Sequence, residues 1–186
     1  MTTTLTRVLP FSKQLLHLAI TAGDTVIDAT VGNGHDTLFL AECVGDLGHV
    51  FGFDVQEAAI NKTQTKLNES AIKNVSLILD GHQNVLNYVD HEISAAIFNL
   101  GYLPGSDQTI TTQGTTTWKA VLDILQLLKK NGLIILVVYH GHEEGKIERH
   151  FIEEHINSLD SKATQVLRYQ FPNRPTSPYI LAIEKL

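Results

Sequence analysis

The stretch Thr25–Asp36, TVIDATVGNGHD, decides the fold of this chain. Val26 and Ile27 are β-branched and apolar, as is typical of a buried strand, and Gly32-Asn33-Gly34 then predicts a turn. Asp36 precedes an apolar segment, so the stretch predicts a strand, a glycine turn and the start of a helix. Glycines at such a junction let a ligand approach the backbone, and the free N–H groups of the helix can bind polar or anionic atoms. The stretch therefore indicates a site for a nucleotide-like cofactor.

Strand-like and helix-like segments alternate outward from this stretch. After the first strand, which starts at Thr25, strands are predicted at residues 49–55, 75–79, 93–100, 133–139, 164–171 and 179–184. Helices are predicted from an N-cap at Ser12, after Asp36, over residues 56–68, around residues 85–89, from Trp118 to a stop at Asn131-Gly132, and around residues 147–159. Residues 106–116 are rich in Thr, Gln and Gly without a period, which predicts a loop.

This order of elements predicts an α/β fold. Five strand–helix alternations followed by two strands without a helix between them favour a doubly wound, Rossmann-like sheet of seven mostly parallel strands that ends in an antiparallel hairpin. We expect a single domain over residues 1–186, with residues 1–23 packed on it as an N-terminal helical segment. The same arrangement is typical of class I methyltransferases that depend on S-adenosylmethionine (SAM).

The composition is that of an ordinary globular protein. A chain of 186 residues can bury roughly 70% of its unfolded surface without a disulfide or a structural metal. Cys43 is the single cysteine, which excludes a disulfide framework and a thiolate metal cluster, so no metal is predicted. The N-terminal sequence lacks the basic and apolar regions of a signal peptide, and no apolar run reaches the roughly 18 residues of a membrane span. We therefore expect a cytoplasmic protein without a membrane partner.

The formal net charge of −6 argues against a protein that holds nucleic acid by bulk electrostatics alone. The segment from Lys162 onward nevertheless carries four basic residues against the single acid Glu184. An anionic partner could dock there, or the charges could simply be solvated.

Polar residues at the ends of three predicted strands indicate a nucleoside. In a doubly wound sheet the ligand lies beyond the carboxyl ends of the strands, beside the first strand. The turn reads Gly32-x-Gly34-x-x-Thr37, and Asp54 follows Gly34 by 20 residues, where an acid can accept hydrogen bonds from both ribose hydroxyls. Asp80-Gly81-His82 would then lie beside an adenine. The alternative is a set of unrelated turns.

Both NAD and SAM bind to this geometry, and three features favour SAM. The turn lacks the third glycine of the dinucleotide fingerprint, which weakens close contact with a pyrophosphate. The chain has no room for a separate substrate domain, and a C-terminal hairpin is unusual for a dehydrogenase. Methyl transfer is therefore the favoured chemistry.

The fourth predicted strand ends in Asn99-Leu100-Gly101-Tyr102-Leu103-Pro104. This segment resembles the Asn-Pro-Pro-Tyr sequence of amino-group methyltransferases, with Leu100 and Gly101 in place of the prolines. The resemblance implies that Asn99 accepts a hydrogen bond from the target nitrogen and that Tyr102 packs on a planar substrate. Alternatively, Asn99 caps a turn and Tyr102 covers the core.

The resemblance extends to a family. Residues 28–37, 52–56, 80–82, 99–104 and 139–142 are similar to the small bacterial proteins called "putative rRNA methylases", and the similarity covers nearly the whole chain. That family includes tRNA wobble-uridine methyltransferases, which convert 5-aminomethyl-2-thiouridine to its 5-methylaminomethyl form with SAM. The resemblance implies the same substrate here, in the anticodon stem-loop of tRNA.

The family also implies roles for individual residues. Asn33 and His35 would contact the amino-acid end of SAM, Asp54 and Gln56 its ribose and adenine side, and Gly81 and His82 its base. The full expected cofactor site comprises Asp28, Gly32, Asn33, Gly34, His35, Asp36, Asp54, Gln56, Asp80, Gly81, His82 and Asn99.

An alkylamine is mostly protonated near neutral pH, so the enzyme must bind or generate its free base. The side-chain amide of Asn99 cannot take the proton of the amine. We expect a titratable group near the strand ends to help, with His140, His142 and Asp107 as candidates, although either histidine could instead hydrogen-bond a loop. Asn99, Tyr102, His140 and His142 form the expected catalytic set.

Arg174, Lys146 and Arg149 are the expected contacts to RNA phosphates, with Arg149 alternatively an ordinary solvated helix residue. Two other classes of function stay open. The acidic charge and the absence of an appended RNA-binding domain would suit a small-molecule methyltransferase, and a binding module without catalysis could keep the same fold. Another RNA, such as rRNA, is a further alternative substrate. An exposed apolar face on the leading helix would favour a homodimer.

Overall fold

The structure is a computed structural model that describes residues 4–101, 111–139, 143–174 and 176–186. Its elements are, in chain order, α1 (Val8–Ala19), β1 (Thr25–Asp28), α2 (His35–Val44), β2 (His49–Asp54), α3 (Glu57–Glu69), β3 (Val75–Leu79), the 3-10 helix η1 (His82–Asn87), β4 (Ile93–Leu100), α4 (Gly114–Leu127), β5 (Leu128–Val138), α5 (Glu143–Ile156), β6 (Thr164–Tyr169) and β7 (Tyr179–Lys185).

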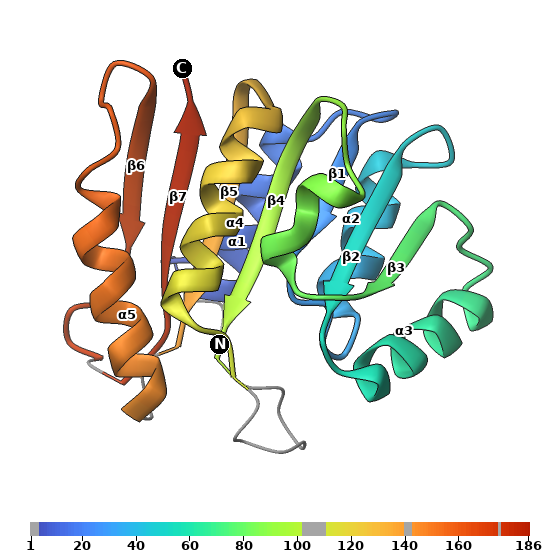
Figure 1. Ribbon diagram of the computed structural model, residues 1–186, viewed down its shortest axis with the longest axis horizontal. Helices are drawn as coiled ribbons and strands as arrows, with labels where there is room; N and C mark the ends of the chain where they lie inside the picture. The colour runs from blue at the N-terminus through green and yellow to red at the C-terminus, as the bar shows by residue number, and fades with distance from the viewer. Residues whose placement is uncertain (1–3, 102–110, 140–142, 175) are drawn as a thin grey trace.

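The strands form one seven-stranded sheet in the order β3-β2-β1-β4-β5-β7-β6. The five strands β1 to β5 are parallel, whereas β7 runs antiparallel to both β5 and β6. The carboxyl ends of the parallel strands therefore lie along one edge, at the bottom of Figure 1. The predicted doubly wound sheet and its C-terminal hairpin are confirmed.

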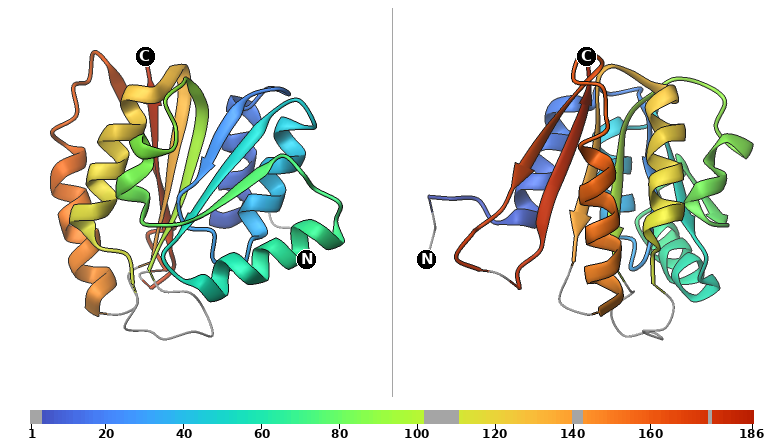
Figure 2. Two further views of the ribbon diagram at one scale, coloured as in Figure 1. Left: turned by 45° about the vertical axis from the view of Figure 1, so that its right-hand side comes forward. Right: turned by 60° about the vertical axis from the view of Figure 1, so that its left-hand side comes forward.

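Two apolar clusters cover the two faces of the sheet, and Figure 2 shows the helices on both sides of it. Alternate side chains of each strand point to opposite faces. In β4, for example, Ala95 and Ile97 belong to the cluster under α1 and α2, whereas Ala96 and Phe98 belong to the cluster under η1, α4 and α5. Burial on both faces explains why the central strands are almost continuously apolar.

Two predicted helix boundaries are wrong. The helix α1 begins at Val8 rather than after Ser12, and the Ser12 hydroxyl donates to the Leu9 carbonyl oxygen inside the helix. The helix α4 ends at Leu127, and Asn131-Gly132 lies within β5 instead of stopping the helix. The register with β4 shifts there, from Leu128 opposite Ile93 to Leu133 opposite Ala95. Between these pairs β5 advances five residues and β4 only two, so three extra residues are accommodated in an irregular stretch of β5.

The loop predicted over residues 106–116 is only partly described. Its last residues, 114–116, belong to the first turn of α4, and residues 102–110 lie outside the described part of the chain. Among the helices that the structure describes, none combines the length and apolar character needed to cross a bilayer.

Candidate active site

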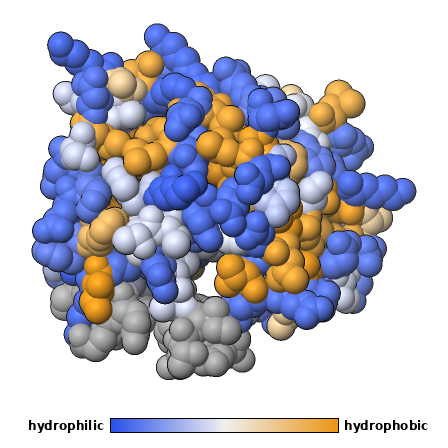
Figure 3. Space-filling view, viewed as in Figure 1, coloured by the Kyte–Doolittle hydropathy of each residue, from blue (hydrophilic) through white to orange (hydrophobic). Residues whose placement is uncertain are grey.

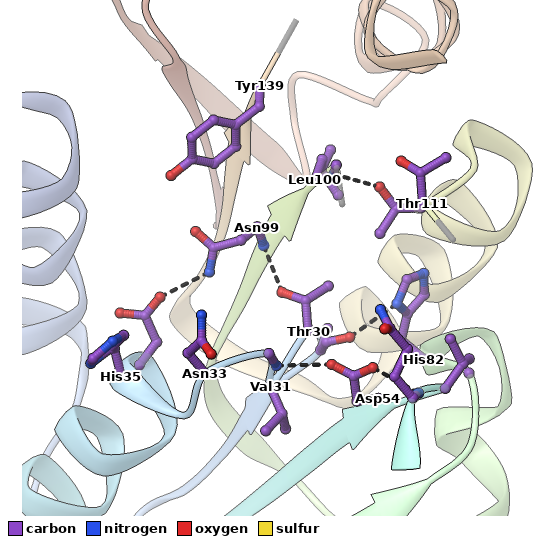
Figure 4. Close-up of a pocket in the computed structure, with 18 of the residues that line it drawn as sticks. Thr30, Val31, Asn33, His35, Asp54, His82, Asn99, Leu100, Thr111 and Tyr139 are labelled. Atoms are coloured by element: carbon purple, nitrogen blue, oxygen red, sulfur yellow. Dashed lines mark hydrogen bonds between the residues drawn. The ribbon is translucent and has the colours of Figure 1, made fainter. Parts of the chain in front are cut away.

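A cavity of about 1120 Å³ lies at the carboxyl edge of the parallel strands. Its walls come from the first turns of α1, the loop after β1, the ends of β2, β3 and β4, the segment before α4, Tyr139 after β5, and Thr176 in the β6–β7 loop. Most of the residues expected to bind the cofactor line this one cavity (Figure 4): Gly32, Asn33, His35, Asp36, Asp54, Gln56, Asp80, Gly81, His82 and Asn99. Asp28 and Gly34 are not among the residues that line it.

The glycine turn follows β1 and is held from the side of α3. Gly34 has a φ of +77°, and a Cβ atom there would lie 2.6 Å from the Thr63 hydroxyl oxygen, so this position requires glycine. The side-chain oxygen Oδ1 of Asn33 accepts a hydrogen bond from Lys62 Nζ at 2.7 Å, and the backbone carbonyl oxygen of Asn33 accepts one from Lys66 Nζ at 2.7 Å. These contacts fix the turn that forms one wall of the cavity.

Asp54 ends β2 and joins two loops. One carboxylate oxygen accepts a hydrogen bond from the Gly32 N–H at 2.8 Å, and the other accepts one from the Gln56 N–H at 2.9 Å. Each carboxylate oxygen can accept a further hydrogen bond. Asp54 can therefore hold the walls of the cavity and still bind a pair of hydroxyl groups.

Asp28 is fully buried at the end of β1. Its carboxylate accepts hydrogen bonds from the Thr37 hydroxyl at 2.6 Å and from the Thr30 N–H at 3.2 Å. Burial, reinforced by the nearby charge of Asp36, raises the pKa of Asp28 to about 7. Asp28 thus shapes the loop after β1 from behind.

The end of β3 carries two groups with different environments. Asp80 accepts hydrogen bonds from the Gly81 N–H, the Asn84 amide and the Tyr88 hydroxyl. These bonds, that from Asn84 foremost, lower the pKa of the Asp80 carboxyl. The imidazole of His82 donates from Nδ1 to the Ala29 carbonyl oxygen at 3.0 Å.

His82 is an uncharged acceptor in the wall of the cavity. Only 8% of its surface is exposed, and burial lowers the pKa of the imidazole. Because Nδ1 carries the donated hydrogen, Nε2 presents a lone pair, and within the described residues this buried atom has no hydrogen-bond partner.

Asn99 near the end of β4 is held at both its backbone and its side chain. Its N–H donates to the Thr30 hydroxyl at 2.7 Å, and its amide Nδ2 donates to an Asp36 carboxylate oxygen at 2.8 Å. The other Asp36 oxygen lies 3.5 Å from Lys13 Nζ of α1. Figure 4 shows the Asn99 amide at the cavity, on the same side as the Tyr139 ring. Within the described part of the chain, the amide oxygen of Asn99 is therefore left to accept a hydrogen bond from a ligand.

A buried carboxylate supports the segment that follows β4. Glu148 of α5 is 3% exposed and accepts hydrogen bonds from the Thr112 hydroxyl at 2.5 Å and the Thr117 hydroxyl at 2.9 Å. Thr112 Oγ1 also accepts a hydrogen bond from the Gly101 N–H at 2.8 Å. This chain connects α5 and α4 to the residues just after Asn99.

The sequence reasoning missed several of these residues. Lys13, Thr112 and Glu148 gave no motif signal, because each acts through a partner far away in the sequence. Thr30 lies within the family-like stretch 28–37, but nothing there indicated its contact with Asn99, 69 positions away. Tyr139 could have been found, since it directly follows the most apolar strand and therefore sits at the carboxyl edge. Burial, and to a lesser extent the charge of Asp36, raises the pKa of its hydroxyl.

The remaining expected site residues fall into two groups. Tyr102, Asp107, His140 and His142 lie outside the described residues. Arg174, Lys146 and Arg149 are described but do not line the cavity. The Nε atom of Arg149 lies 3.1 Å from a Glu153 carboxylate oxygen, and the exposed Arg174 guanidinium lies 5.6 Å from the centre of the Phe171 ring.

Known proteins match this chain in sequence. A family model described as "Putative rRNA methylase" matches residues 50–185, and one described as "Protein-L-isoaspartate(D-aspartate) O-methyltransferase (PCMT)" matches residues 3–93. A curated relative, the "tRNA (mnm(5)s(2)U34)-methyltransferase, chloroplastic" of Arabidopsis thaliana, is 36% identical over 177 residues. The match covers 89% of this chain, and the chain spans only 65% of that relative's length.

Solved structures match over the whole chain. The crystal structure of a "putative rRNA-methylase" from Clostridium thermocellum is 41% identical with a TM-score of 0.97, covering 99% of this chain and 100% of the other. A "putative methyltransferase" from Streptococcus mutans, solved in complex with SAH, is 41% identical with a TM-score of 0.91, covering 98% and 100%. The sheet and hairpin are therefore the Rossmann-like fold of class I SAM-dependent methyltransferases. The chain belongs to the "Putative rRNA methylase" family.

Proposed function

We propose that this protein is a SAM-dependent N-methyltransferase that methylates the aminomethyl group of 5-aminomethyl-2-thiouridine at the wobble position of tRNA. The observation that carries the proposal is the Asn99 amide, fixed through Asp36 and Thr30 with its oxygen left for a ligand at the cavity. An amide oxygen in that position suits a target with an N–H group. The family and the name of the Arabidopsis relative support RNA as the bearer of that amine.

The residues of the cavity fit SAM. The Asp54 carboxylate can accept hydrogen bonds from both ribose hydroxyls. The lone pair of His82 Nε2, which has no partner among the described residues, suits a donor such as the adenine amino group. Asn33 and His35 lie in the cavity wall at the glycine turn, where we place the amino-acid end. SAH, the demethylated product of SAM, is bound in the Streptococcus mutans relative.

The protein's part in the reaction is to position a neutral amine. When bound, SAM supplies a methyl group whose C–S bond breaks as the nitrogen lone pair forms the N–C bond; the sulfur keeps the bonding electron pair, and the amine loses one proton. Asn99 accepts a hydrogen bond from the amine and directs its lone pair. We propose that Tyr102 packs on the uracil ring and that His140 or His142 takes the proton.

We further propose that Arg174, Lys146 and Arg149 contact the phosphates of the anticodon stem-loop. Arg174 lies two residues before Thr176, which lines the cavity. We therefore place a phosphate close to the target nucleotide near Arg174. Hydrophilic side chains predominate at the left margin of the face in Figure 3, over α5 and β6. Charged contacts of this kind give a weak, salt-dependent attraction that brings the target nucleotide to the cavity.

The test uses purified protein, SAM and two synthetic anticodon stem-loops, one with 5-aminomethyl-2-thiouridine and one with 2-thiouridine at the wobble position. We expect methylation of the first RNA alone, measured by mass spectrometry of its nucleosides. Replacing Asn99 with Ala should lower kcat while leaving SAM binding, measured by calorimetry, within about twofold, because the amide contacts the amine in this proposal.

Two results would contradict the proposal in different ways. SAM binding without methylation of either RNA would favour another RNA or a small-molecule amine as the substrate. Failure of the wild-type protein to bind SAM would refute every methyltransferase activity.

A further inference from the structure

We infer that Asp36 is the positioning residue of the methyl-transfer site: it fixes and polarises the Asn99 amide so that its oxygen faces the target amine. The inference rests on the proposed function and deepens it. The sequence assigned Asp36 only to the cofactor site, as the acid that opens the helix α2.

The contact between the two side chains settles which end of the amide is free. An amide presents two donors on Nδ2 and an acceptor on Oδ1. Asn99 Nδ2 donates to Asp36 Oδ2 at 2.8 Å, and a carboxylate can only accept in this contact. If the amide turned over, its oxygen would face the carboxylate, and two acceptors would be in contact. Asp36 therefore selects the orientation that presents an acceptor to the amine.

Contacts on the other side hold the carboxylate itself. Lys13 Nζ of α1 lies 3.5 Å from Asp36 Oδ1, the oxygen that does not contact Asn99. The ammonium also lies 4.9 Å from the centre of the Phe39 ring of α2. The backbone of Asn99 is fixed independently by its hydrogen bond to Thr30 Oγ1. Three elements, α1, α2 and β4, thus determine the direction of a single amide oxygen.

The charge of Asp36 adds to this orientation. A hydrogen bond from an amide N–H to a carboxylate draws electron density toward the amide oxygen, and such chains strengthen one another in a site of low dielectric constant. Positive charge develops on the amine nitrogen as the N–C bond forms. An amide oxygen made more negative stabilises that charge in the transition state more than in the ground state, which is what raises kcat.

Two substitutions separate orientation from charge. Asp36→Asn keeps an oxygen that can accept from Asn99 but removes the charge, whereas Asp36→Leu removes both. Asp90→Asn is the control, since this carboxylate is 96% exposed and precedes β4, at the opposite edge of the sheet from the cavity. The measurements are kcat and KM at saturating SAM, SAM affinity by calorimetry, and the affinity of the SAH-loaded protein for the aminomethyl and unmodified 2-thiouridine stem-loops.

We expect kcat to fall in the order wild type, Asp36→Asn, Asp36→Leu. The Leu variant should lose about tenfold to hundredfold, the range for one hydrogen bond to a charged group. SAM affinity should stay within about twofold of wild type. The Leu variant should also lose the preference for the amine-bearing RNA, which does not depend on turnover, and Asp90→Asn should behave as wild type.

Distinct outcomes would overturn the inference. Wild-type kcat in Asp36→Leu refutes it, and so does a loss of activity that saturating SAM restores, because Asp36 would then be a cofactor ligand only. If the Leu variant does not fold, the Asn variant decides: unchanged kcat together with an unchanged RNA preference refutes the inference. A wild-type protein that binds SAM but methylates neither RNA refutes the proposed function instead.

Discussion

At the scale of single residues, Asp28 and Asp54 show two ways in which a carboxylate can serve the same cavity. Asp28 is closed off from the cavity and orders the loop after β1 through Thr37 and Thr30. Asp54 forms part of the cavity wall and uses both oxygens on backbone N–H groups of neighbouring loops. We therefore expect Asp28 to affect stability and its pH dependence, and Asp54 to affect ligand binding.

Asp28 should make the protein less stable as the pH rises. Its pKa is raised from an ordinary value of about 4 to about 7 in the folded protein, mainly by burial. Between these values the folded state holds a proton that the unfolded chain releases. The resulting stabilisation is fully present below about pH 4 and is lost as the pH rises through about 7. In Asp28→Asn, calorimetric Tm should fall less between about pH 5 and 8 than in the wild type.

The control for this prediction is Asp90→Asn, which removes a carboxylate that is almost fully exposed. Its Tm should follow the wild-type pH dependence. Equal slopes in Asp28→Asn and the wild type would show that Asp28 does not hold the extra proton.

Asp54 should contribute strongly to SAM affinity. Replacing it with Ala removes the acceptor for the ribose hydroxyls and also leaves the Gly32 and Gln56 N–H groups without their partner. Each lost hydrogen bond to a charged group is worth about 1.5–3 kcal/mol. We expect binding at least about tenfold weaker by calorimetry, with Asp54→Asn intermediate because its amide oxygen still accepts. Wild-type affinity in Asp54→Ala would remove Asp54 from the cofactor site.

At the scale of secondary-structure elements, the β6–β7 hairpin brings basic residues to the carboxyl edge. Tyr179 of β7 is paired with Val138 at the end of β5, so the hairpin loop lies beside the cavity. Arg168 of β6 and Arg149 of α5 both contact one Glu153 carboxylate oxygen, at 3.0 and 3.1 Å. Two guanidinium groups thus share one Glu153 carboxylate, on the side of the sheet where we propose that the stem-loop approaches.

Arg174 in this hairpin loop gives the sharpest test of RNA contact. Each phosphate contact that is lost should reduce the slope of log affinity against log salt concentration by about 0.7–0.9. We expect that reduction in Arg174→Ala, measured by fluorescence anisotropy with the anticodon stem-loop, and a retained slope in Arg174→Lys. Lys73→Ala, in the exposed turn before β3, is the charge-matched control. An unchanged slope in Arg174→Ala would place the RNA elsewhere.

The elements that the sequence predicted correctly are those specified by neighbouring residues. The stretch from Thr25 and the apolar run from Leu133 both carry their own strand signal, and both strands formed. The end of α4 was predicted wrongly, because it depends on a residue far away in the sequence. Lys185 of β7 donates from Nζ to the backbone carbonyl oxygens of Leu125 and Leu128. A cation from about sixty residues away satisfies the end of this helix, so Asn131-Gly132 was not needed there.

The same distinction applies to the site. Gly32, Asp54 and Asn99 stand next to strand ends and line the cavity. Spacing predicted the first two, and the resemblance to the Asn-Pro-Pro-Tyr sequence predicted Asn99. The contact of Asp36 with Asn99 joins residues 63 positions apart, and Thr112 reaches Glu148 across 36. Spacing along the chain cannot predict such contacts, because they form only when α2, β4 and α5 pack together.

At the scale of the whole molecule, the two apolar clusters lie on opposite faces of one continuous sheet. The lone Trp118 of α4 is 8% exposed and packs in the cluster with β4, β5 and α5. The residues that we assign to SAM lie mainly beyond β1, β2 and β3. Because β1 and β4 are paired neighbours, neither cluster can be exposed without disturbing the strands that carry the other.

The molecule should therefore unfold as one cooperative unit, so that a ligand bound at one end of the sheet stabilises the other. At a SAM concentration of about one hundred times Kd, the free energy of unfolding should rise by about 2.7 kcal/mol. Trp118 fluorescence, which reports on α4, and far-UV circular dichroism, which reports on the whole backbone, should both shift by this amount in urea titrations and should coincide with and without SAM. Asp54→Ala at the same SAM concentration is the control and should shift less. A ligand stabilises only those residues that unfold together with its site. If the circular dichroism transition moved with SAM while the Trp118 transition did not, the β4–β5–α4 half would therefore unfold on its own.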